Sequence, residues 1–517
     1  MPIADQNRIY DGWVSLEAGV DAGRAPTLLE PNQAVSAENM VFRGGHPAAR
    51  PGWRKLDEDF RNPDHCYELN GDNSLETVTG QEASTAYKHG RFQGAIGFSP
   101  HNGDDCLMAM INGRLFKIVP RVSGSIVTEI ELDYRNTVNR TIAYMLQADK
   151  WLVIQDGQSS AIIYDGATAR RANETSVFED SVPRGGPRTR RTTYITDSDK
   201  TEVPVGTIMA YGMGRIVVIV KDRAVAFGDL YGSHDGEDAA DSLVRFTERN
   251  FLAGGFDAGI PFQQGLATGA VFFPQLDTST GNGQLMVFAE RGASSFFLSL
   301  PREVWQTSQF QILALLTTGL RGHRSLSVVN EDLWFRAEDG SRSYRQARSE
   351  ATGWSHIPLS TNVRQFFDVD TATLLKYCSS IYFDNRIVMT SSPYWNQMRP
   401  FHTGAVVVDF DIISSFGTKN RPAWDGHWQK YNSGIKILQV VTGKFKGVTR
   451  AFFFGLDANG ENQLYEMSTN DKDDFDGHID WELVFRSFDF TKVTQQGSAF
   501  TESELYDGDV WLREIIE

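Results

Sequence analysis

The sequence predicts an all-β fold, and more specifically a β-propeller of six to seven irregular blades with loop insertions and an N-terminal arm. Three observations support this prediction. Glycine occurs 47 times in 517 residues and aromatic residues make up 12% of the chain, which is typical of short aromatic strands joined by tight turns. One hairpin design recurs about seven times. Helical patterns are few.

The clearest copy of the hairpin runs from Asp332 to Arg345. An aromatic strand, Leu333 to Arg336, is followed by a turn at Glu338-Asp339-Gly340 and a second strand, Ser341 to Arg345. Asp-Gly tolerates the positive φ angles that a tight hairpin requires. We therefore assign the acidic pair to turn geometry, and Trp334 and Phe335 to packing between blades or sheets.

The repeat is defined by seven short apolar strands, each introduced by a turn residue or a charge. They span residues 114–119, 150–155, 215–220, 284–289, 332–336, 386–390 and 450–455. Units of three to four strands at roughly 40–50 residues, with insertions, are typical of a propeller. A large β-sandwich would also contain hairpins and is the alternative fold. Residues 310–316 fit either a helix or a buried strand.

The expected organisation has three parts. Residues 1–60 form an N-terminal arm, residues 61–490 form the propeller, and residues 491–517 form a C-terminal segment. Within the arm, Val35 to Phe42 is predicted as one strand, followed by breaks at Gly44-Gly45 and Pro51-Gly52. Two insertions interrupt the propeller, at about 165–206 and 250–266.

Composition restricts the compartment and the partners. No apolar run approaches the roughly 20 residues of a membrane span, and the first residues lack the apolar core of a secretory signal. Three cysteines, Cys66, Cys106 and Cys378, fit neither a disulfide framework nor a zinc site, so we expect reduced, mostly buried thiols and synthesis in a reducing cytoplasm. The net charge of −16 argues against a broad DNA-binding surface.

Both insertions are candidate protein-interaction surfaces. The first carries six arginines in an otherwise acidic protein, which indicates either a contact with an acidic neighbouring subunit or with nucleic acid, or a solvated loop with its own carboxylate partners. The second is glycine-rich and carries phenylalanines that form either a protein contact or a buried crossover. The candidate residues are Arg170, Arg171, Arg184, Arg188, Arg190, Arg191, Phe251, Phe256 and Phe262.

No catalytic, cofactor or metal signature is present, so we predict a protein that is not an enzyme and holds no cofactor. The histidines and cysteines have no metal-ligand spacing, and nucleophile-elbow and phosphate-loop motifs are absent. The acidic loop 471–476 lacks the spacing of an EF-hand and is either an acidic turn or a weak cation site. A carboxylate pair for glycoside hydrolysis stays open, because 66 acidic residues make some close pair inevitable.

Several stretches of the chain resemble virion β-propeller proteins of tailed bacteriophages. In the arm these are Pro31-Asn-Gln-Ala, Arg43-Gly-Gly and Arg50-Pro-Gly52. Further on they are Leu300-Pro-Arg302, Trp305, Gly322-His-Arg-Ser325, Asp332-Leu-Trp-Phe335, Asp339-Gly340, Ser343, Asp384-Asn-Arg386 and Trp424-Asp-Gly426. The likeness covers roughly residues 30–490, and its motifs are structural.

The resemblance implies a non-enzymatic tail or neck component of the virion, such as a nozzle ring or an adaptor. Such a protein is made in the host bacterial cytoplasm and forms a homo-oligomeric ring. Its partners would be portal, adaptor or fibre proteins, and DNA would pass through its bore during ejection. An acidic chain suits a conduit that must not retain DNA.

Two other functions remain open. The chain could be a carbohydrate-binding or depolymerising receptor-binding tail protein, in which Trp13, Trp53, Trp395, Trp424 and Trp428 stack on sugars. It could also be a cytosolic propeller that serves as an interaction scaffold.

Overall fold

The structure is a computed structural model, and every structural statement below concerns the residues that it describes. These are residues 16–30, 32–60, 66–69, 75–78, 80–122, 124–139, 142–172, 202–233, 238–246, 258–273, 284–298, 305, 311–316, 318–329, 332–344, 358–368, 370–396, 399–416, 419–429, 436–468, 473–474 and 477–487.

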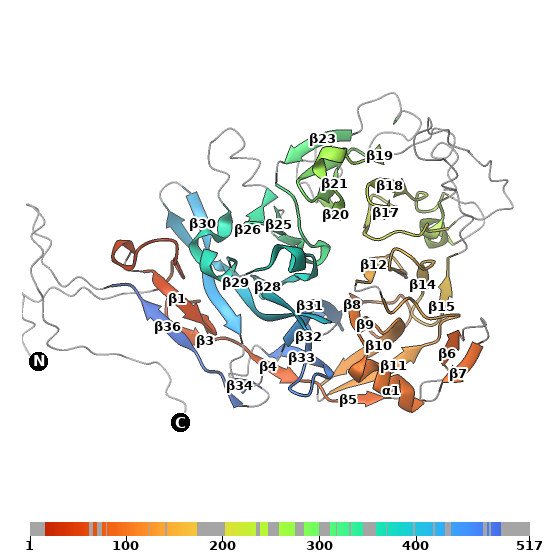
Figure 1. Ribbon diagram of the computed structural model, residues 1–517, viewed down its shortest axis with the longest axis horizontal. Coiled ribbons are helices and arrows are strands. Elements are labelled where there is room, and N and C mark those ends of the chain that lie inside the picture. The colour runs from red at the N-terminus through yellow and green to blue at the C-terminus, as the bar shows by residue number, and fades with distance from the viewer. Residues whose placement is uncertain are drawn as a thin grey trace, which may run out of the picture.

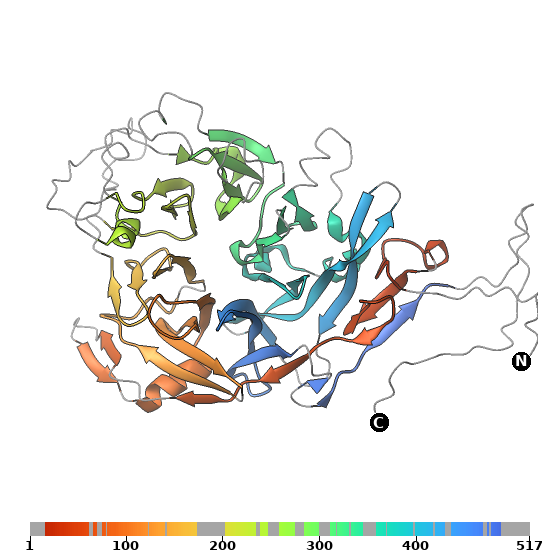
Figure 2. The same ribbon diagram turned by 180° about the vertical axis from the view of Figure 1, so that it is seen from behind.

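The chain forms an all-β propeller, which confirms the predicted fold class. Antiparallel sheets follow one another around a common centre, and the chain passes through them in sequence order (Figures 1 and 2). The first blade is β8 (Phe92–Phe98), β9 (Cys106–Ile111), β10 (Arg114–Arg121) and β11 (Gly124–Ile130), with β5 (Glu58–Phe60) added at its edge.

The next four blades differ in size, but each is an antiparallel meander. The second is β12 (Tyr144–Ala148), β13 (Trp151–Gln155), β14 (Ile162–Tyr164) and β15 (Ala169–Arg171). The third is β16 (Met209–Gly212), β17 (Arg215–Val220), β18 (Ala224–Phe227) and β19 (Ala258–Gly259). The fourth is β20 (Ala267–Phe273), β21 (Gln284–Ala289), β22 (Gly292–Phe296) and β23 (Gln311–Leu316). The fifth is β24 (Ser327–Val329), β25 (Asp332–Ala337) and β26 (Gly340–Ser343).

The turns within these four meanders differ in length. The turn between β16 and β17, for example, has only two residues, Met213 and Gly214.

The last third of the chain, together with β1 (Ala34–Glu38) and β4 (Gly52–Lys55) from the N-terminal part, builds one ten-stranded sheet. Its strands are β27 (Ser380–Phe383), β28 (Arg386–Asn396), β29 (Arg399–Phe416), β30 (Lys419–Gln429), β31 (Lys436–Phe445), β32 (Val448–Leu456), β33 (Asn462–Ser468), β4, β1 and β36 (Glu482–Phe485). Five sheets therefore stand as separate blades, rather than the six or seven predicted. The reason is that β29 pairs with both β30 and β31, which joins the remaining strands into a single sheet.

Small elements complete the described part of the chain. Three two-stranded sheets pair β2 (Met40–Val41) with β3 (Ala48–Ala49), β6 (Cys66–Leu69) with β7 (Leu75–Val78), and β34 (Asp473–Asp474) with β35 (Gly477–His478). The helices are α1 (Gly80–His89) and the 3₁₀ turns η1 (Pro26–Leu28), η2 (Ala239–Val244), η3 (Phe262–Gln264), η5 (His323–Ser325), η6 (Leu359–Phe366) and η7 (Ala372–Tyr377).

The propeller is closed by the segment of residues 52–60, which we call the closing segment. Its strand β4 pairs with β33 near the C-terminal end of the described chain, and its strand β5 pairs with β11 of the first blade. Between the two strands, Leu56 N–H donates to Leu464 and the Asp57 carbonyl accepts from Ser125 N–H. The N-terminal part of the chain thus links the ten-stranded sheet to the first blade.

Close approach of inner strands also joins the first blade to the ten-stranded sheet. β8 lies against β31, where a Cβ atom added at Gly97 would come within 2.4 Å of the Thr442 carbonyl oxygen. Glycine is required at this position because any side chain would push the two strands apart.

All seven predicted first strands are present, as β10, β13, β17, β21, β25, β28 and β32. Tight turns of Asn112-Gly113, Met213-Gly214 and Lys446-Gly447 precede three of them, and in each turn both residues have positive φ. This is the backbone geometry of the type I′ turn, whose twist matches that of paired strands. Residues 311–316 form a strand, which decides between the two predicted alternatives.

The prediction of one strand over Val35 to Phe42 is wrong. Asn39 has φ of 55° and separates β1 from β2. A left-handed residue interrupts the extended backbone, and asparagine is one of the few residues that adopt this conformation readily.

The predicted packing roles of Trp334 and Phe335 are confirmed. Phe335 lies 5.1 Å from Phe288 of the fourth blade, measured between ring centroids. Trp334 points to the opposite face and lies 5.3 Å from Phe410 of the ten-stranded sheet. The alternation of side chains along β25 therefore fills the core on both sides of the fifth blade.

Two of the three cysteines can be placed. Cys106 and Cys378 are both free and buried, as predicted. Burial raises the pKa of each thiol to about 12, so both are protonated at neutral pH.

None of the helices in the described ranges is both long enough and apolar enough to pass through a membrane.

Candidate functional site

A pocket of about 610 Å³ lies where the inner ends of several blades meet, and we call it the central pocket. Its walls come from the start of β12, the residue before β16, the start of β20, the β21–β22 and β25–β26 turns, and the region of η5 and η7. These elements surround the middle of the ring in Figure 1. The lining residues are Ile142, Tyr144, Ile208, Leu266, Ala267, Thr268, Glu290, Arg321, Gly322, His323, Arg324, Glu338, Ala372, Thr373 and Lys376.

Charged groups of both signs border the central pocket. Arg321 forms an ion pair with Glu338, which lies in the turn between β25 and β26. One carboxylate oxygen of Glu290 accepts a hydrogen bond from Leu266 N–H at 3.3 Å. Lys376 lies in η7, with its ammonium group 5.1 Å from the centre of the Tyr377 ring. The pocket therefore offers both donors and acceptors.

Arg324 and His323 form the partly buried base of this region. Arg324 donates to the carbonyl oxygens of Gln93 and Ala143, which ties η5 to the first two blades. Burial lowers the pKa of Arg324 to about 10 and that of His323 to about 4. At neutral pH the arginine is charged and already bonded within the protein, whereas the imidazole is neutral.

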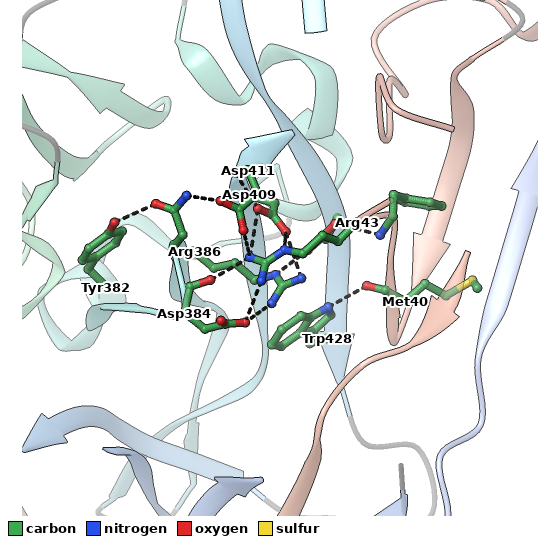
Figure 3. Close-up of polar contacts among 11 residues, drawn as sticks. Met40, Arg43, Tyr382, Asp384, Arg386, Asp409, Asp411 and Trp428 are labelled. Atoms are coloured by element: carbon green, nitrogen blue, oxygen red, sulfur yellow. Dashed lines mark hydrogen bonds and ion pairs between the residues drawn. The ribbon is translucent and has the colours of Figure 1, made fainter. Parts of the chain in front are cut away.

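A second polar group, the arginine cluster, consists of Arg43, Arg386, Asp384, Asp409, Asp411 and Asp425. Figure 3 shows the two guanidinium groups lying between carboxylates from the β27–β28 turn and from β29. Arg43 Nε lies 3.1 Å from Asp409, and Arg386 Nη2 lies 2.8 Å from the same carboxylate. Arg386 Nε also binds Asp425 at 3.1 Å.

Local sequence explains how the arginine cluster is positioned. Asp384 and Asn385 form the two-residue turn between β27 and β28, and both have positive φ. This turn places the Asp384 carboxylate beside Arg386 and within 3.1 Å of Arg43. Beside the cluster, Trp428 Nε1 donates to the Met40 carbonyl at 2.9 Å (Figure 3). The cluster therefore fastens the N-terminal segment to the ten-stranded sheet.

Two of the four acids of the arginine cluster, Asp409 and Asp425, are not accessible to a substrate, whereas Asp384 and Asp411 are 38% and 42% exposed and form ion pairs with Arg43. The side chains of Asp409 and Asp425 are fully buried, and both are engaged by Arg386. Burial raises the pKa of Asp425 to about 7, and the Arg386 guanidinium opposes this shift. We therefore assign these carboxylates to structure.

The raised pKa of Asp425 predicts a specific pH dependence of stability. Its ordinary value is 3.8, so between about pH 4 and 7 the folded protein binds this proton more tightly than the unfolded chain does. The contribution of Asp425 to the free energy of unfolding is therefore largest at low pH, falls as the pH rises to about 7, and is then constant. An Asp425→Asn variant lacks this contribution.

Urea denaturation of both proteins at about pH 5, 6, 7 and 8 tests this prediction. The parent protein should lose stability relative to Asp425→Asn mainly between pH 5 and 7. A stability difference that does not change over this interval would show that Asp425 titrates elsewhere.

A second buried ion pair involves the predicted acidic loop 471–476, of which Asp473 and Asp474 are described. The Asp474 carboxylate is bound by the Arg50 guanidinium through both oxygens, at 3.0 and 2.8 Å, and accepts from Trp53 N–H at 2.9 Å. Both side chains of the pair are almost fully buried. Asp474 is thus occupied by an arginine, and no group of acids, histidines or cysteines in the described ranges is arranged to hold a metal ion.

Two of the predicted interaction arginines can be placed, and both have partners within the chain. Arg170 forms an ion pair with Glu202 at 2.7 Å and keeps 45% of its side chain exposed. Arg171 donates to the carbonyl oxygens of Ser160 and Tyr134 and stacks 4.0 Å from the Tyr134 ring. The remaining four, Arg184, Arg188, Arg190 and Arg191, lie outside the described residues.

Among the predicted interaction phenylalanines, Phe262 is described. It begins η3, is 76% exposed, and lies 4.2 Å beneath the Arg223 guanidinium. Phe251 and Phe256 lie outside the described residues. A protein contact at Phe262 stays a prediction.

The tryptophans considered for sugar stacking have different environments. Trp53, Trp424 and Trp428 are buried in the core and cannot stack on a sugar, whereas Trp395 is 48% exposed. Trp13 lies outside the described residues. The expected set of stacking residues is therefore wrong for three of its members.

No protein-family model matches this chain, and no curated protein matches it. Three similar solved structures are the computationally designed Ika8 protein, YCF48 bound to D1 peptide, and Trypanosoma rangeli sialidase in complex with the inhibitor DANA. For the designed protein, the identity is 10%, the cover is 80% of this chain and 99% of that chain, and the TM-score is 0.35.

The other two structures are equally distant. For YCF48, the identity is 9%, the cover is 74% of this chain and 93% of that chain, and the TM-score is 0.37. For the sialidase, the identity is 10%, the cover is 81% of this chain and 60% of that chain, and the TM-score is 0.31. Similarity at this level gives no argument about activity or partners.

Proposed function

We propose that this chain is a non-enzymatic structural component of a tailed-phage virion, a ring, nozzle or adaptor that assembles with further copies of itself. The resemblance of the arm and of the central run motivates this proposal. Portal, adaptor or fibre proteins would be its neighbours, and its place would be the tail or neck of the particle.

The observation that carries the proposal is the projecting end of the ten-stranded sheet. There β1 pairs with β30 on one side and with β36 on the other, so both ends of the described chain meet in one sheet beside the ring (Figures 1 and 2). Within the described residues β36 ends the order of strands in this sheet. Trp481, directly before β36, is 52% exposed, and Val484, within it, is 40% exposed. An exposed strand edge with apolar side chains is a surface suited to a neighbouring subunit.

Two further properties support a structural role. The arginines of the resembling motifs, Arg43 and Arg50, fasten the N-terminal segment through ion pairs with the buried carboxylates of Asp409 and Asp474. The net charge of −16 suits a ring through which DNA passes without being retained.

We also propose that the ten-stranded sheet supplies two more blades, which gives seven in total. Its strands β27–β30 form one meander, and β31–β33 with β4 form another. A single residue pair, His402 with Ile437, joins the two. An experimental electron density map would test this count by whether the two meanders separate at that pair.

Mass spectrometry of purified phage particles tests the structural role. We expect the chain to be present in stoichiometric amounts and to stay with the particle after washing in high salt. Its absence from particles whose genome encodes it would contradict the proposal.

A carbohydrate-binding or depolymerising tail protein is the second candidate. The observation that favours it is the central pocket, which brings Glu290 and Glu338 to one concave surface. Paired carboxylates are the usual catalytic groups of glycoside hydrolysis. A reducing-end assay on bacterial surface polysaccharide, with Glu290→Gln as the comparison, would separate the two candidates: release of reducing ends that this variant abolishes favours the second.

A further inference from the structure

The central pocket has the size and composition of a ligand site. Its volume of about 610 Å³ lies within the range of roughly 300–1,000 Å³ that small-molecule sites occupy. Ile142, Ile208 and Leu266 supply apolar wall, and Tyr144 adds an aromatic ring. Apolar walls with a few polar groups between them are typical of sites that bind an amphipathic small molecule.

Polar groups around the central pocket retain unused bonding capacity. No described carboxylate forms an ion pair with Lys376, and no described cation forms one with Glu290. Lys376 is exposed, and Glu290 is half-buried and accepts from Leu266 N–H through one carboxylate oxygen. Both side chains therefore keep hydrogen-bonding capacity that a ligand in the pocket can use.

The arrangement of charge selects the class of ligand. An anion in the pocket would be repelled by Glu290 and Glu338. A cation would be repelled by Arg321, Arg324 and Lys376. A neutral ligand rich in hydroxyl groups avoids both repulsions, because each hydroxyl can donate to a carboxylate and accept from an ammonium or guanidinium group. Sugar rings also present apolar C–H faces to aliphatic and aromatic walls.

We propose that the central pocket binds a short neutral saccharide, with Glu290 accepting from ligand hydroxyls and Lys376 donating to them. The inference deepens the second candidate function, but it does not require hydrolysis and does not depend on ring assembly. If the pocket binds no saccharide, the proposed structural role is unaffected. If the chain is absent from phage particles, the proposed saccharide site is unaffected.

Saturation-transfer NMR on the full chain tests the site with glucose, galactose, N-acetylglucosamine, maltose and lactose as probes, and with glucuronic acid as an anionic comparison. We expect transfer to at least one neutral sugar and none to glucuronic acid. Loss of a hydrogen bond to a charged group should weaken binding by roughly tenfold or more in Glu290→Gln and in Lys376→Met.

Matched controls are Glu131→Gln and Lys444→Met, which alter exposed residues away from the pocket. These two variants should bind as the parent does. The inference is overturned if no neutral sugar shows transfer, if glucuronic acid binds as well as the neutral sugars, or if all four variants bind equally. Circular dichroism of each variant confirms that it is folded before binding is compared.

Discussion

Replacing Arg386 with methionine is expected to lower the free energy of unfolding by about 3–5 kcal/mol. The Arg386 side chain is 6% exposed and lies between three carboxylates, those of Asp384, Asp409 and Asp425. Methionine has a similar volume but no charge, so the fully buried Asp409 and Asp425 lose their shared cation. Asp409 keeps its ion pair with Arg43, whereas Asp425 loses the guanidinium that binds it. The cost is therefore that of buried carboxylates whose charge is less well compensated.

Urea denaturation followed by far-UV circular dichroism measures this effect at about pH 7. Arg364→Met is the matched control, because the ion pair of Arg364 with Asp368 has both side chains largely exposed and should contribute less than about 1 kcal/mol. Arg386→Lys keeps the positive charge but not the planar guanidinium group. Its loss of stability should therefore lie between those of Arg386→Met and Arg364→Met. Equal small losses in Arg386→Met and Arg364→Met would refute the structural assignment of the arginine cluster.

Arg50→Met is expected to have a comparable effect, again about 3–5 kcal/mol. Arg50 and Asp474 are 1% and 2% exposed, and their carboxylate–guanidinium contact uses both oxygens. Without the guanidinium, Asp474 keeps the hydrogen bond from Trp53 N–H but loses its ion pair with Arg50. Trp53 belongs to β4 of the closing segment, so the variant should also loosen the link between the last sheet and the first blade.

A double variant distinguishes the loss of the pair from loss of packing. Arg50→Met with Asp474→Asn removes the uncompensated charge and should recover part of the stability lost in Arg50→Met alone. Hydrogen exchange should be faster at the β4 amides in Arg50→Met than in the parent. If the double variant is less stable by the full sum of the two single losses, the two residues do not act as a pair.

Local patterns were sufficient to predict the strands but not their association into sheets. An apolar run next to a turn pair such as Asn112-Gly113 identifies a hairpin because both signals lie within a few residues of each other. The number of separate blades depends instead on pairing between β29 and β31, which hydrophobic periodicity does not encode. The asparagine at position 39 indicated an interruption of the first predicted strand, since asparagine adopts positive φ more readily than most residues.

The arginine cluster could not be predicted from sequence because its members are far apart along the chain. Arg43 and Asp409 are separated by 366 residues, and no spacing rule connects them. One local signal was available: Asp384-Asn385 forms a hairpin turn directly before Arg386. The resemblance also included Arg43 and Arg50, but its motifs do not indicate which residues form ion pairs with these arginines.

The central pocket was likewise beyond sequence reasoning. Glu290 and Glu338 each lie in a turn between two strands, where an acid is ordinarily a solvated turn residue, and Lys376 lies in a short 3₁₀ helix. Only the arrangement of blades around the centre brings them to one surface. The predicted interaction residues come from the insertions instead, and the described ones, Arg170, Arg171 and Phe262, lie outside the lining of this pocket.

The central claim, assembly as a virion component, is tested most directly by the mass of the full chain in solution. Light scattering at micromolar concentration, with negative-stain images of the same sample, should give a multiple of 57.8 kDa and ring-shaped particles. A stable species of 57.8 kDa that also fails to join phage particles when added to them would contradict the claim.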